Sequence, residues 1–237
     1  MRYSARLGIG LSAVTQPGRG SGLDRSLAEF VRHDVAMLEI FGKRFDVTDG
    51  IPGSPESVGN NVAYLFGRYG GCTLNGGLYR VHGASSSKAA SVMIREAYPE
   101  LYFPIVPFGF DWLGRQFILD LRRPEKDPEM LCLEPGTGWI LEIPIPFSSF
   151  HDSELVQDPD GSLLTTFFSD WRKKNPEDLQ FDECAGYTVP LFLGGADEVH
   201  NLELSNIEVY WSVTGQLRTA TKDLPRGPHV DGFQIGD

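Results

Sequence analysis

The side chains best suited to catalysis or metal binding are five histidines and three cysteines, which lie far apart in this chain of 237 residues. No histidine pair has the HExxH spacing of a zinc site, and the cysteines form no CxxC pair. One polar cluster remains, His151-Asp152-Ser153-Glu154, which suits a metal or acid–base site but also suits the solvated end of a helix. We favour the helix end, so the sequence predicts no catalytic residue, no metal and no cofactor.

A short segment of mixed charge is a second candidate. Asp111 and Arg115 flank Trp112. The two charges either form an ion pair that shapes a turn, or they present a partner-binding knob, since tryptophan and arginine are enriched at interface hot spots. The ion pair is the favoured interpretation, and all three residues are kept as candidate partner-binding residues.

Two pairs of acids form the third candidate. Asp182 and Glu183 precede Cys184, and Asp197 and Glu198 follow a Gly-Gly break. They come close together only if the strands around them pair. As a pair of catalytic carboxylates they lack a recognisable base or pocket, so we interpret them as part of an acidic docking surface or as ordinary solvated loops.

The charge distribution supports an acidic surface. The net charge is −11, although residues 1–25 carry +3, so the rest of the chain carries −14. From Glu129 to Tyr210, sixteen acids stand against three basic residues, a net of −13. Such a surface repels phosphate backbones and anionic membranes and attracts a basic partner. No apolar run reaches the roughly 20 residues that span a bilayer.

The elements that position these residues centre on a meander. Aromatic and aliphatic runs at 103–110, 116–122, 130–133 and 139–143 are separated by three short turns, which predicts four antiparallel strands between Phe103 and Pro144. Pro104 and Pro107 indicate that the first strand is irregular or lies at an edge.

Helical spacing predicts further elements around the meander. We expect helices over 24–41, 62–69 and 88–98, a short one ending at Leu155, and an amphipathic one over 163–171. Asn75-Gly76-Gly77 predicts a tight turn between two strands. Residues 189–193 look buried. Strict alternation of apolar residues over 206–217 predicts a final strand.

These elements predict one α+β domain with a central antiparallel, possibly mixed, sheet flanked by helices. We expect a flexible leader over 1–22, a single domain over 23–217 and a mobile tail over 218–237. The three isolated cysteines fit a reducing compartment.

The sequence also resembles a known family. The blocks that carry the resemblance are Phe110–Phe117, Leu133–Gly138, Phe150–Leu155, Gly186–Gly195, Asn201–Glu203 and Val209–Trp211. Together they are similar to the C-terminal domain of immunity proteins that accompany type VI secretion DNase effectors, and more loosely to the SUKH immunity superfamily. The resemblance covers about half of the chain, from about Phe108 to Leu217.

The resemblance implies a non-enzymatic, cytoplasmic bacterial protein that binds and neutralises a cognate toxin. Combined with the acidic charge, it predicts a basic toxin such as a nuclease, with no direct binding of nucleic acid or membrane. Two alternatives stay open: a general interaction or scaffold module, and a small-molecule hydrolase that uses Cys132, His151 or the loop acids.

Overall fold

The computed structural model describes residues 38–53, 61–123 and 128–222. In this part of the chain the helices are α2 (Phe41–Arg44), α3 (Asn61–Tyr69), α4 (Ala84–Ala97), α5 (Phe147–Ser149), α6 (Leu155–Gln157), α7 (Pro159–Leu163), α8 (Thr165–Arg172) and α9 (Ile207–Thr221). The strands are β1 (Val47–Asp49), β2 (Thr73–Leu74), β3 (Tyr79–Val81), β4 (Ile105–Asp111), β5 (Gln116–Asp120), β6 (Glu129–Glu134), β7 (Trp139–Ile143), β8 (Glu183–Tyr187) and β9 (Leu202–Asn206).

The seven strands β1–β7 form one antiparallel sheet in which each strand lies beside its neighbours in the chain. The predicted four-stranded meander is its larger half, β4 to β7, so that prediction and the α+β class are confirmed, and the sheet extends beyond the meander. The predicted Asn75–Gly77 turn joins β2 to β3 as a short 3₁₀ turn. The connections from β1 to β2 and from β3 to β4 contain α3 and α4, whereas the remaining connections in the sheet are short.

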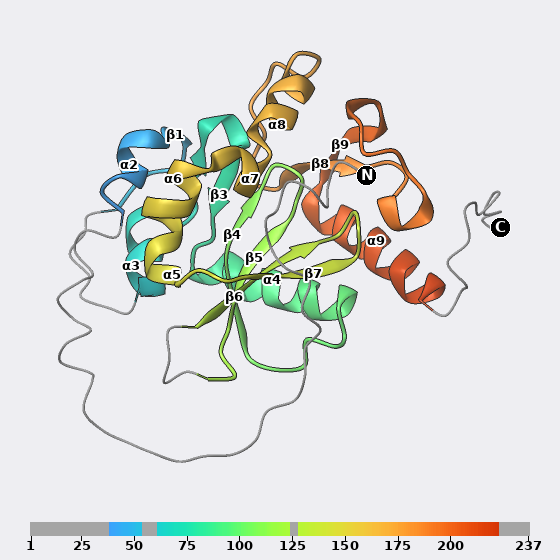
Figure 1. Ribbon diagram of the computed structural model, residues 1–237, viewed down its shortest axis with the longest axis horizontal. Coiled ribbons are helices and arrows are strands. Elements are labelled where there is room, and N and C mark those ends of the chain that lie inside the picture. The colour runs from blue at the N-terminus through green and yellow to red at the C-terminus, as the bar shows by residue number, and fades with distance from the viewer. Residues whose placement is uncertain (1–37, 54–60, 124–127, 223–237) are drawn as a thin grey trace.

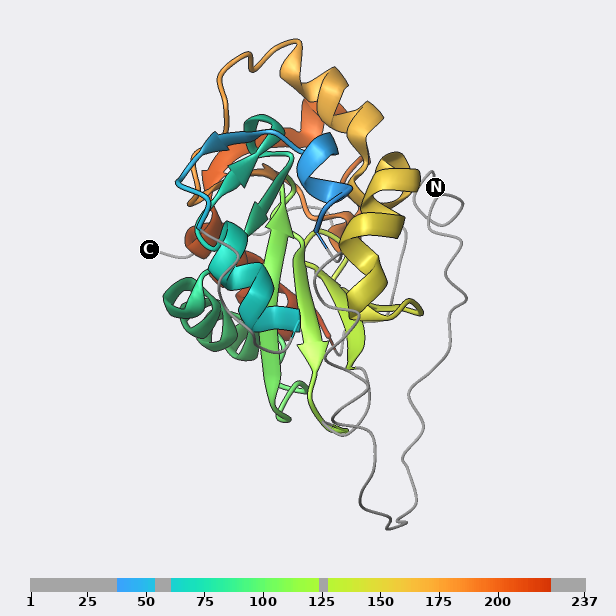
Figure 2. The ribbon, with the colours of Figure 1, turned by 90° about the vertical axis from the view of Figure 1, so that its left-hand side faces the viewer.

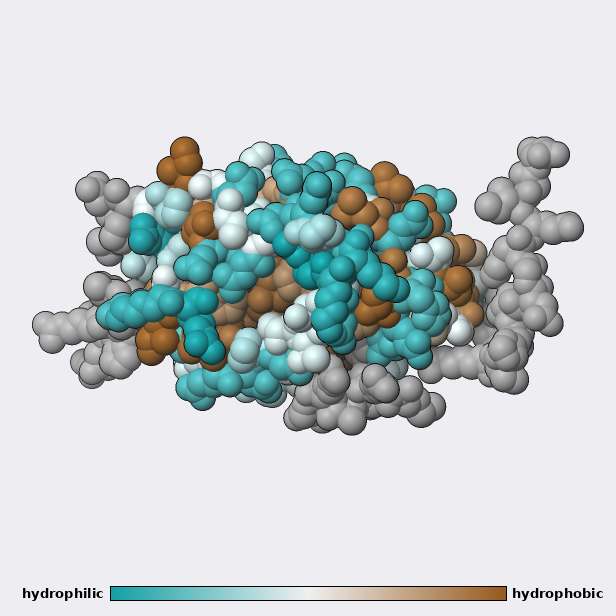
Figure 3. Space-filling view, turned by 90° about the horizontal axis from the view of Figure 1, so that it is seen from above, coloured by the Kyte–Doolittle hydropathy of each residue, from teal (hydrophilic) through white to brown (hydrophobic). Residues whose placement is uncertain are grey.

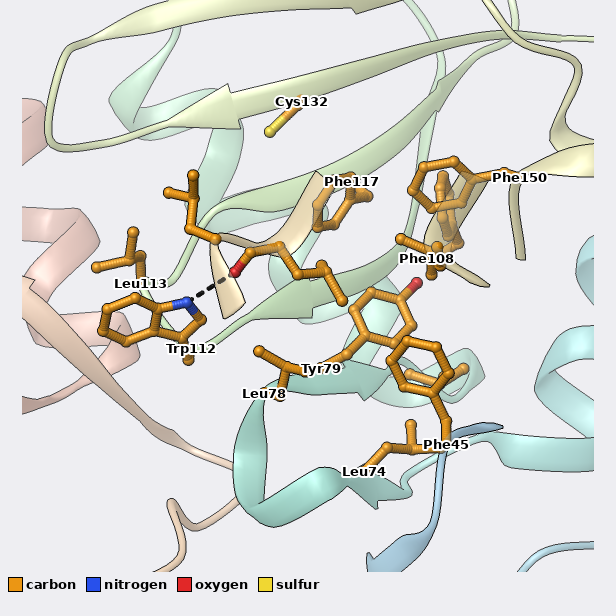
Figure 4. Close-up of a cluster of buried hydrophobic side chains, with 14 of the residues drawn as sticks. Phe45, Leu74, Leu78, Tyr79, Phe108, Trp112, Leu113, Phe117, Cys132 and Phe150 are labelled. Carbon is orange, nitrogen blue, oxygen red and sulfur yellow. Dashed lines mark hydrogen bonds between the residues drawn. The ribbon is translucent and has the colours of Figure 1, made fainter. Parts of the chain in front are cut away.

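Helices cover both faces of this sheet (Figures 1 and 2). Residues two apart in a regular strand share a face, but the register of β4 with β5 shifts between Pro107 and Gly109. Because of this irregularity, Phe108 and Phe110 of β4 point into different hydrophobic clusters. The cluster around Phe108 packs beneath α2, α3 and the helices after β7, and Figure 4 shows part of it. The cluster around Phe110 packs beneath α4 and α9, and includes Trp211.

β4 is irregular but does not lie at an edge. It pairs with β3 on one side and with β5 on the other, and its register with β5 shifts between Pro107 and Gly109. A proline lacks the N–H that a regular ladder position needs, and the shift accommodates it. The expectation of an irregular strand is confirmed, and the edge alternative is wrong.

Several predicted helices are present. α3 and α4 confirm the predictions over 62–69 and 88–98, with α4 beginning earlier, at Ala84. The short helix predicted before Leu155 is a continuous helical stretch of α5, a π-helical turn over Phe150–Glu154, and α6. α8 matches the amphipathic prediction. Most of the helix predicted over 24–41, and the predicted leader over 1–22, lie outside the described residues.

The predicted strand over 206–217 is wrong, because this segment forms helix α9. Of the alternating apolar residues, Ile207 and Trp211 are buried, whereas Val209 and Val213 are exposed. The buried residues recur three or four positions apart, which is helical spacing. The Asn206 side chain caps the helix by accepting hydrogen bonds from two first-turn N–H groups. α9 continues to Thr221, past the start of the predicted tail at residue 218.

β8 and β9 form a separate two-stranded antiparallel sheet, which we call the ribbon. It stands at one end of the main sheet, beside α9 (Figure 1). The loop between its strands contains residues 189–193, which were predicted to be buried. That prediction is wrong, because Val189 is 45% exposed and residues 191–193 are only half-buried.

Candidate functional site

The turn between β4 and β5 contains three of the candidate residues. All of them are buried: Asp111 and Trp112 are fully enclosed and Arg115 is 1% exposed. Arg115 Nε lies 2.6 Å from Asp111 Oδ2, and the other oxygen of Asp111 accepts the N–H groups of Leu113 and Arg115. Burial raises the pKa of Asp111, and the Arg115 guanidinium opposes that rise. The ion-pair interpretation is therefore the one that the structure shows.

The side chains of this turn hold a neighbouring segment. Trp112 Nε1 donates to the carbonyl of Leu163 at 2.9 Å, the contact drawn as a dashed line in Figure 4. Arg115 Nη2 donates to the carbonyl of Ser162 at 2.8 Å. Asp111, Trp112 and Arg115 have no surface with which to touch a partner, so the partner-binding prediction for these three residues is wrong.

The backbone carbonyls of the same turn hold the ribbon and α9. The N–H of Ala185 in β8 donates to the carbonyl of Trp112 at 2.7 Å. Trp211 Nε1 of α9 donates to the carbonyl of Gly114 at 2.8 Å. A Cβ on Gly114 would lie 3.2 Å from the sulfur of Cys184, and its φ of +75° also favours glycine. The turn therefore anchors β8 and α9 to the main sheet.

The turn between β6 and β7 anchors the loop of the ribbon to the main sheet in the same way. The carbonyl of Gly136 accepts the N–H groups of Leu191 and Phe192, at 2.8 and 3.3 Å. A Cβ on Gly136 would lie 2.5 Å from the ring of Tyr187, so only glycine allows this close approach. Glu134 is buried at the end of β6, where Thr137 Oγ1 donates to it at 2.9 Å.

The two acid pairs lie at opposite ends of the ribbon. Asp182 Oδ2 accepts from Asn206 Nδ2 at 3.2 Å, and Glu183 stands opposite Asn206 in the register. At the other end, Tyr187 Oη donates to Asp197 Oδ1 at 2.8 Å. The strands around the acids do pair, yet roughly 13 Å of strand separates the two pairs. They do not form a joint carboxylate site, because the ribbon holds them at its two ends.

Two further ribbon residues, which point to opposite faces of the ribbon, were not among the candidates. Glu203 and Leu204 lie in β9, between the two acid pairs, and both are exposed, Leu204 by 52%. Their signal in the sequence is the short alternation Leu202-Glu203-Leu204 that precedes the capping residue Asn206. The face of the molecule seen from above is mostly hydrophilic, with patches of hydrophobic side chains among the polar ones (Figure 3).

Cys132 and His151, two of the residues that the hydrolase alternative would use, are buried in the hydrophobic core. Burial raises the pKa of the Cys132 thiol to about 12, so the thiolate needed for nucleophilic attack does not form near neutral pH. Burial lowers the pKa of His151 to about 3. The His151 ring packs against Phe41 and Phe108, and its Nε2 lies 3.1 Å from Tyr79 Oη.

Among the described residues, no three histidine, cysteine, aspartate or glutamate side chains are grouped so that they could hold a metal ion. No helix in the same residues is both long and apolar enough to cross a membrane.

Known structures support the fold. The crystal structure of Atu4351 from Agrobacterium tumefaciens superposes with a TM-score of 0.50, over 76% of this chain and 88% of that chain, at 17% sequence identity. Identity at this level shows a shared fold and nothing about activity. No curated protein sequence matches the chain.

The matching family model is described as the C-terminal domain of the type VI secretion immunity protein Tdi1, and it covers residues 154–218. These residues run from the end of the π-helical turn through α8, the ribbon and most of α9. The blocks at 110–117 and 133–138, which also carried the resemblance, lie before the match. They form the two turns that anchor it. The match confirms the resemblance to type VI secretion immunity proteins for the C-terminal part of the chain.

Proposed function

We propose that this chain is a non-enzymatic immunity protein that binds and neutralises the cognate toxin of a type VI secretion system. The observation that carries the proposal is the match of residues 154–218 to the immunity family. In this proposal the protein acts in the bacterial cytoplasm. It does not itself bind nucleic acid or membrane, and the more distant SUKH-like relationship remains part of the proposal.

The charge of the matched segment favours a basic toxin, such as a nuclease. Between Lys174 and Arg218 there is no lysine or arginine. The same stretch contains eight acids: Glu177, Asp178, Asp182, Glu183, Asp197, Glu198, Glu203 and Glu208. A nuclease that grips phosphate presents a basic surface, and an acidic inhibitor associates with such a surface quickly.

The burial of the titratable core residues favours a binding role over catalysis. Cys132 belongs to the hydrophobic cluster around Phe108, and the His151 ring packs against that cluster. Burial holds both side chains in their neutral forms. Within the matched segment, the exposed acids Asp182, Glu198 and Glu203 are spread along the ribbon and its loop. Such an arrangement suits recognition of a protein surface, where a few anchors within a charged field provide specificity.

The direct test is co-expression with the toxin encoded beside this gene. The toxin alone should stop growth of the host, and the toxin with this chain should not. A toxin variant without activity should co-purify with the chain, which separates binding from loss of toxin expression. If cells die equally with and without this chain, the immunity function is wrong. Co-purification without protection would favour the scaffold alternative.

A second measurement tests the acidic surface. We expect the quadruple variant Asp182→Asn, Glu183→Gln, Asp197→Asn, Glu198→Gln to bind the inactive toxin with a slower association rate. The matched control neutralises four exposed acids outside the matched segment, Asp49→Asn, Glu96→Gln, Glu129→Gln and Glu142→Gln. Equal losses in both variants would show that net charge, and not this surface, drives association.

A further inference from the structure

The ribbon has one occupied edge and one open edge. β8 is joined to the main sheet through the Ala185 N–H and the Trp112 carbonyl. β9 pairs only with β8 among the described residues. The outer edge of β9 is therefore an unpaired strand edge, to which a further strand could add.

The register identifies the backbone groups on this open edge. Hydrogen bonds from Thr188 N to Asn201 O and from Ile207 N to Asp182 O fix the hydrogen-bonded pairs at both ends of the ribbon. Because these pairs alternate along an antiparallel ladder, Glu203 turns its N–H and C=O toward β8. The N–H and C=O groups of Leu204 therefore point away from β8, and the C=O of Leu202 points the same way.

Those outward groups have no partner in the described part of the chain. The Leu202 N–H is already used by the 3₁₀ turn before β9, where it donates to Val199 O. The Leu202 carbonyl and both backbone groups of Leu204 remain. Proteins usually protect an exposed edge with lysine, proline or a bulge, and β9 has none of these.

The side chains along the edge alternate in character. Leu204 lies opposite Ala185, on the face that packs toward the Phe108 cluster, and 52% of it is exposed. Glu203 lies opposite Gly186, on the face toward α9, and it is exposed. A strand laid against β9 would therefore meet an apolar side chain on one face and a carboxylate on the other.

We propose that β9 is a docking strand, and that a strand of a basic protein adds to its open edge and extends the ribbon to three strands. The incoming strand alternates apolar and basic side chains, which contact Leu204 and Glu203. This inference rests on the proposed function, because the basic protein is the toxin, and it adds how and where the toxin binds. Strand addition takes its affinity from backbone hydrogen bonds and its specificity from alternate side chains.

The first experiment measures binding of the inactive toxin to single variants. Leu204→Pro removes an N–H that points away from β8, so the ribbon ladder keeps its hydrogen bonds while the docking edge loses a donor. We expect about tenfold weaker binding, which corresponds to one lost hydrogen bond at an interface. Glu203→Lys should also weaken binding. Glu142→Lys is the matched control, since it makes the same charge change at an exposed position of β7, and its binding should stay at the wild-type level.

A thermal melt of each variant checks that the ribbon still folds. If Leu204→Pro melts early, Leu204→Ala together with amide hydrogen exchange replaces it, and the Leu204 amide of the wild type should exchange more slowly once the toxin binds. Wild-type binding by both Leu204→Pro and Glu203→Lys overturns the docking strand and leaves the immunity function standing.

The second experiment does not depend on the toxin. The probe is a short peptide in which lysine and valine alternate, compared with the same peptide N-methylated at alternate residues. The unmodified peptide should bind the wild type, and both N-methylation and Leu204→Pro should abolish that binding. Equal binding of the two peptides overturns strand addition, as does failure of the unmodified peptide to bind. A failed co-expression test with successful peptide binding would instead refute the proposed toxin while keeping the edge.

Discussion

Charged side chains have different environments in the main sheet and in the ribbon. In the main sheet, charged groups such as Arg80, Asp111 and Arg115 are buried and held by hydrogen bonds. In and around the ribbon, the acids lie at the surface, and some make hydrogen bonds only to near neighbours. The same residue types thus fix the fold in one region and leave a charged surface available in the other. The difference follows from burial, because a buried charge without a partner costs far more free energy than an exposed one.

Breaking the buried ion pair should have the largest effect. We expect Arg115→Ala to lower the free energy of unfolding by about 3–5 kcal/mol, because Asp111 is left as a buried charge and the Ser162 carbonyl loses its donor. Urea denaturation measures the change. The double variant Asp111→Ala with Arg115→Ala should lose less than the sum of the two single losses. Additive losses would mean that the pair is not coupled.

Acid should destabilise the fold through two buried histidines. Burial lowers the pKa of His151 to about 3 and of His82 to about 4, below the ordinary value of about 6.5 that applies when the chain is unfolded. The unfolded chain therefore binds more protons between these values, and stability falls as the pH drops below about 6.5. Between pH 6.5 and pH 5 each histidine should cost about 2 kcal/mol.

The variants His151→Gln and His82→Gln test this pH dependence by denaturation at several pH values. Each variant should show a shallower fall in stability between pH 6.5 and pH 5 than the wild type. An unchanged slope in both would place the acid sensitivity in the carboxylates instead.

Removing the cap of α9 should have a moderate effect. Asn206→Ala deletes the side chain that accepts the N–H groups of Glu208 and Val209, and we expect a loss of about 1 kcal/mol. Ser205→Ala, one residue earlier in β9, is the matched control and should change stability by less than about 0.5 kcal/mol. Thermal unfolding distinguishes the two variants, and equal losses would mean that the cap contributes nothing.

Neutralising a ribbon acid should have the smallest effect on the fold. Glu203→Gln should change the unfolding free energy by less than about 0.5 kcal/mol, because the side chain is exposed. Denaturation in urea checks this value. A loss of unfolding free energy comparable to that of Arg115→Ala would contradict the difference between the two regions, since it would show that charged side chains of the ribbon also stabilise the fold.

The meander could be predicted from the sequence because its strands are apolar and its turns contain proline and glycine. The ribbon could not. β8 is short and contains Gly186, and its pairing with β9 depends on contacts with Trp112 and Gly136 that are distant in the sequence. α9 was mistaken for a strand because its buried face includes Trp211, while the two exposed valines complete an alternating pattern.

The candidate site could be predicted only in part from the sequence. The acidic character of the C-terminal segment is a property of composition, so it could be inferred directly. The burial of Asp111, Trp112 and Arg115 depends on packing against α7, and this packing leaves no periodic signal within the turn itself. The docking edge at Leu204 required the register of the ribbon, which only the structure provides.

The strict chain order of β1 to β7 has a consequence for how the protein folds. Each of these strands pairs with the one before it, so most of the main sheet can grow through local contacts, which form early and quickly. The ribbon and α9 instead attach to carbonyls of turns made much earlier in the chain. We therefore expect the acidic surface to be assembled last, on a sheet that is already in place. A newly synthesised chain would then be able to bind a partner only after its C-terminal residues have been synthesised.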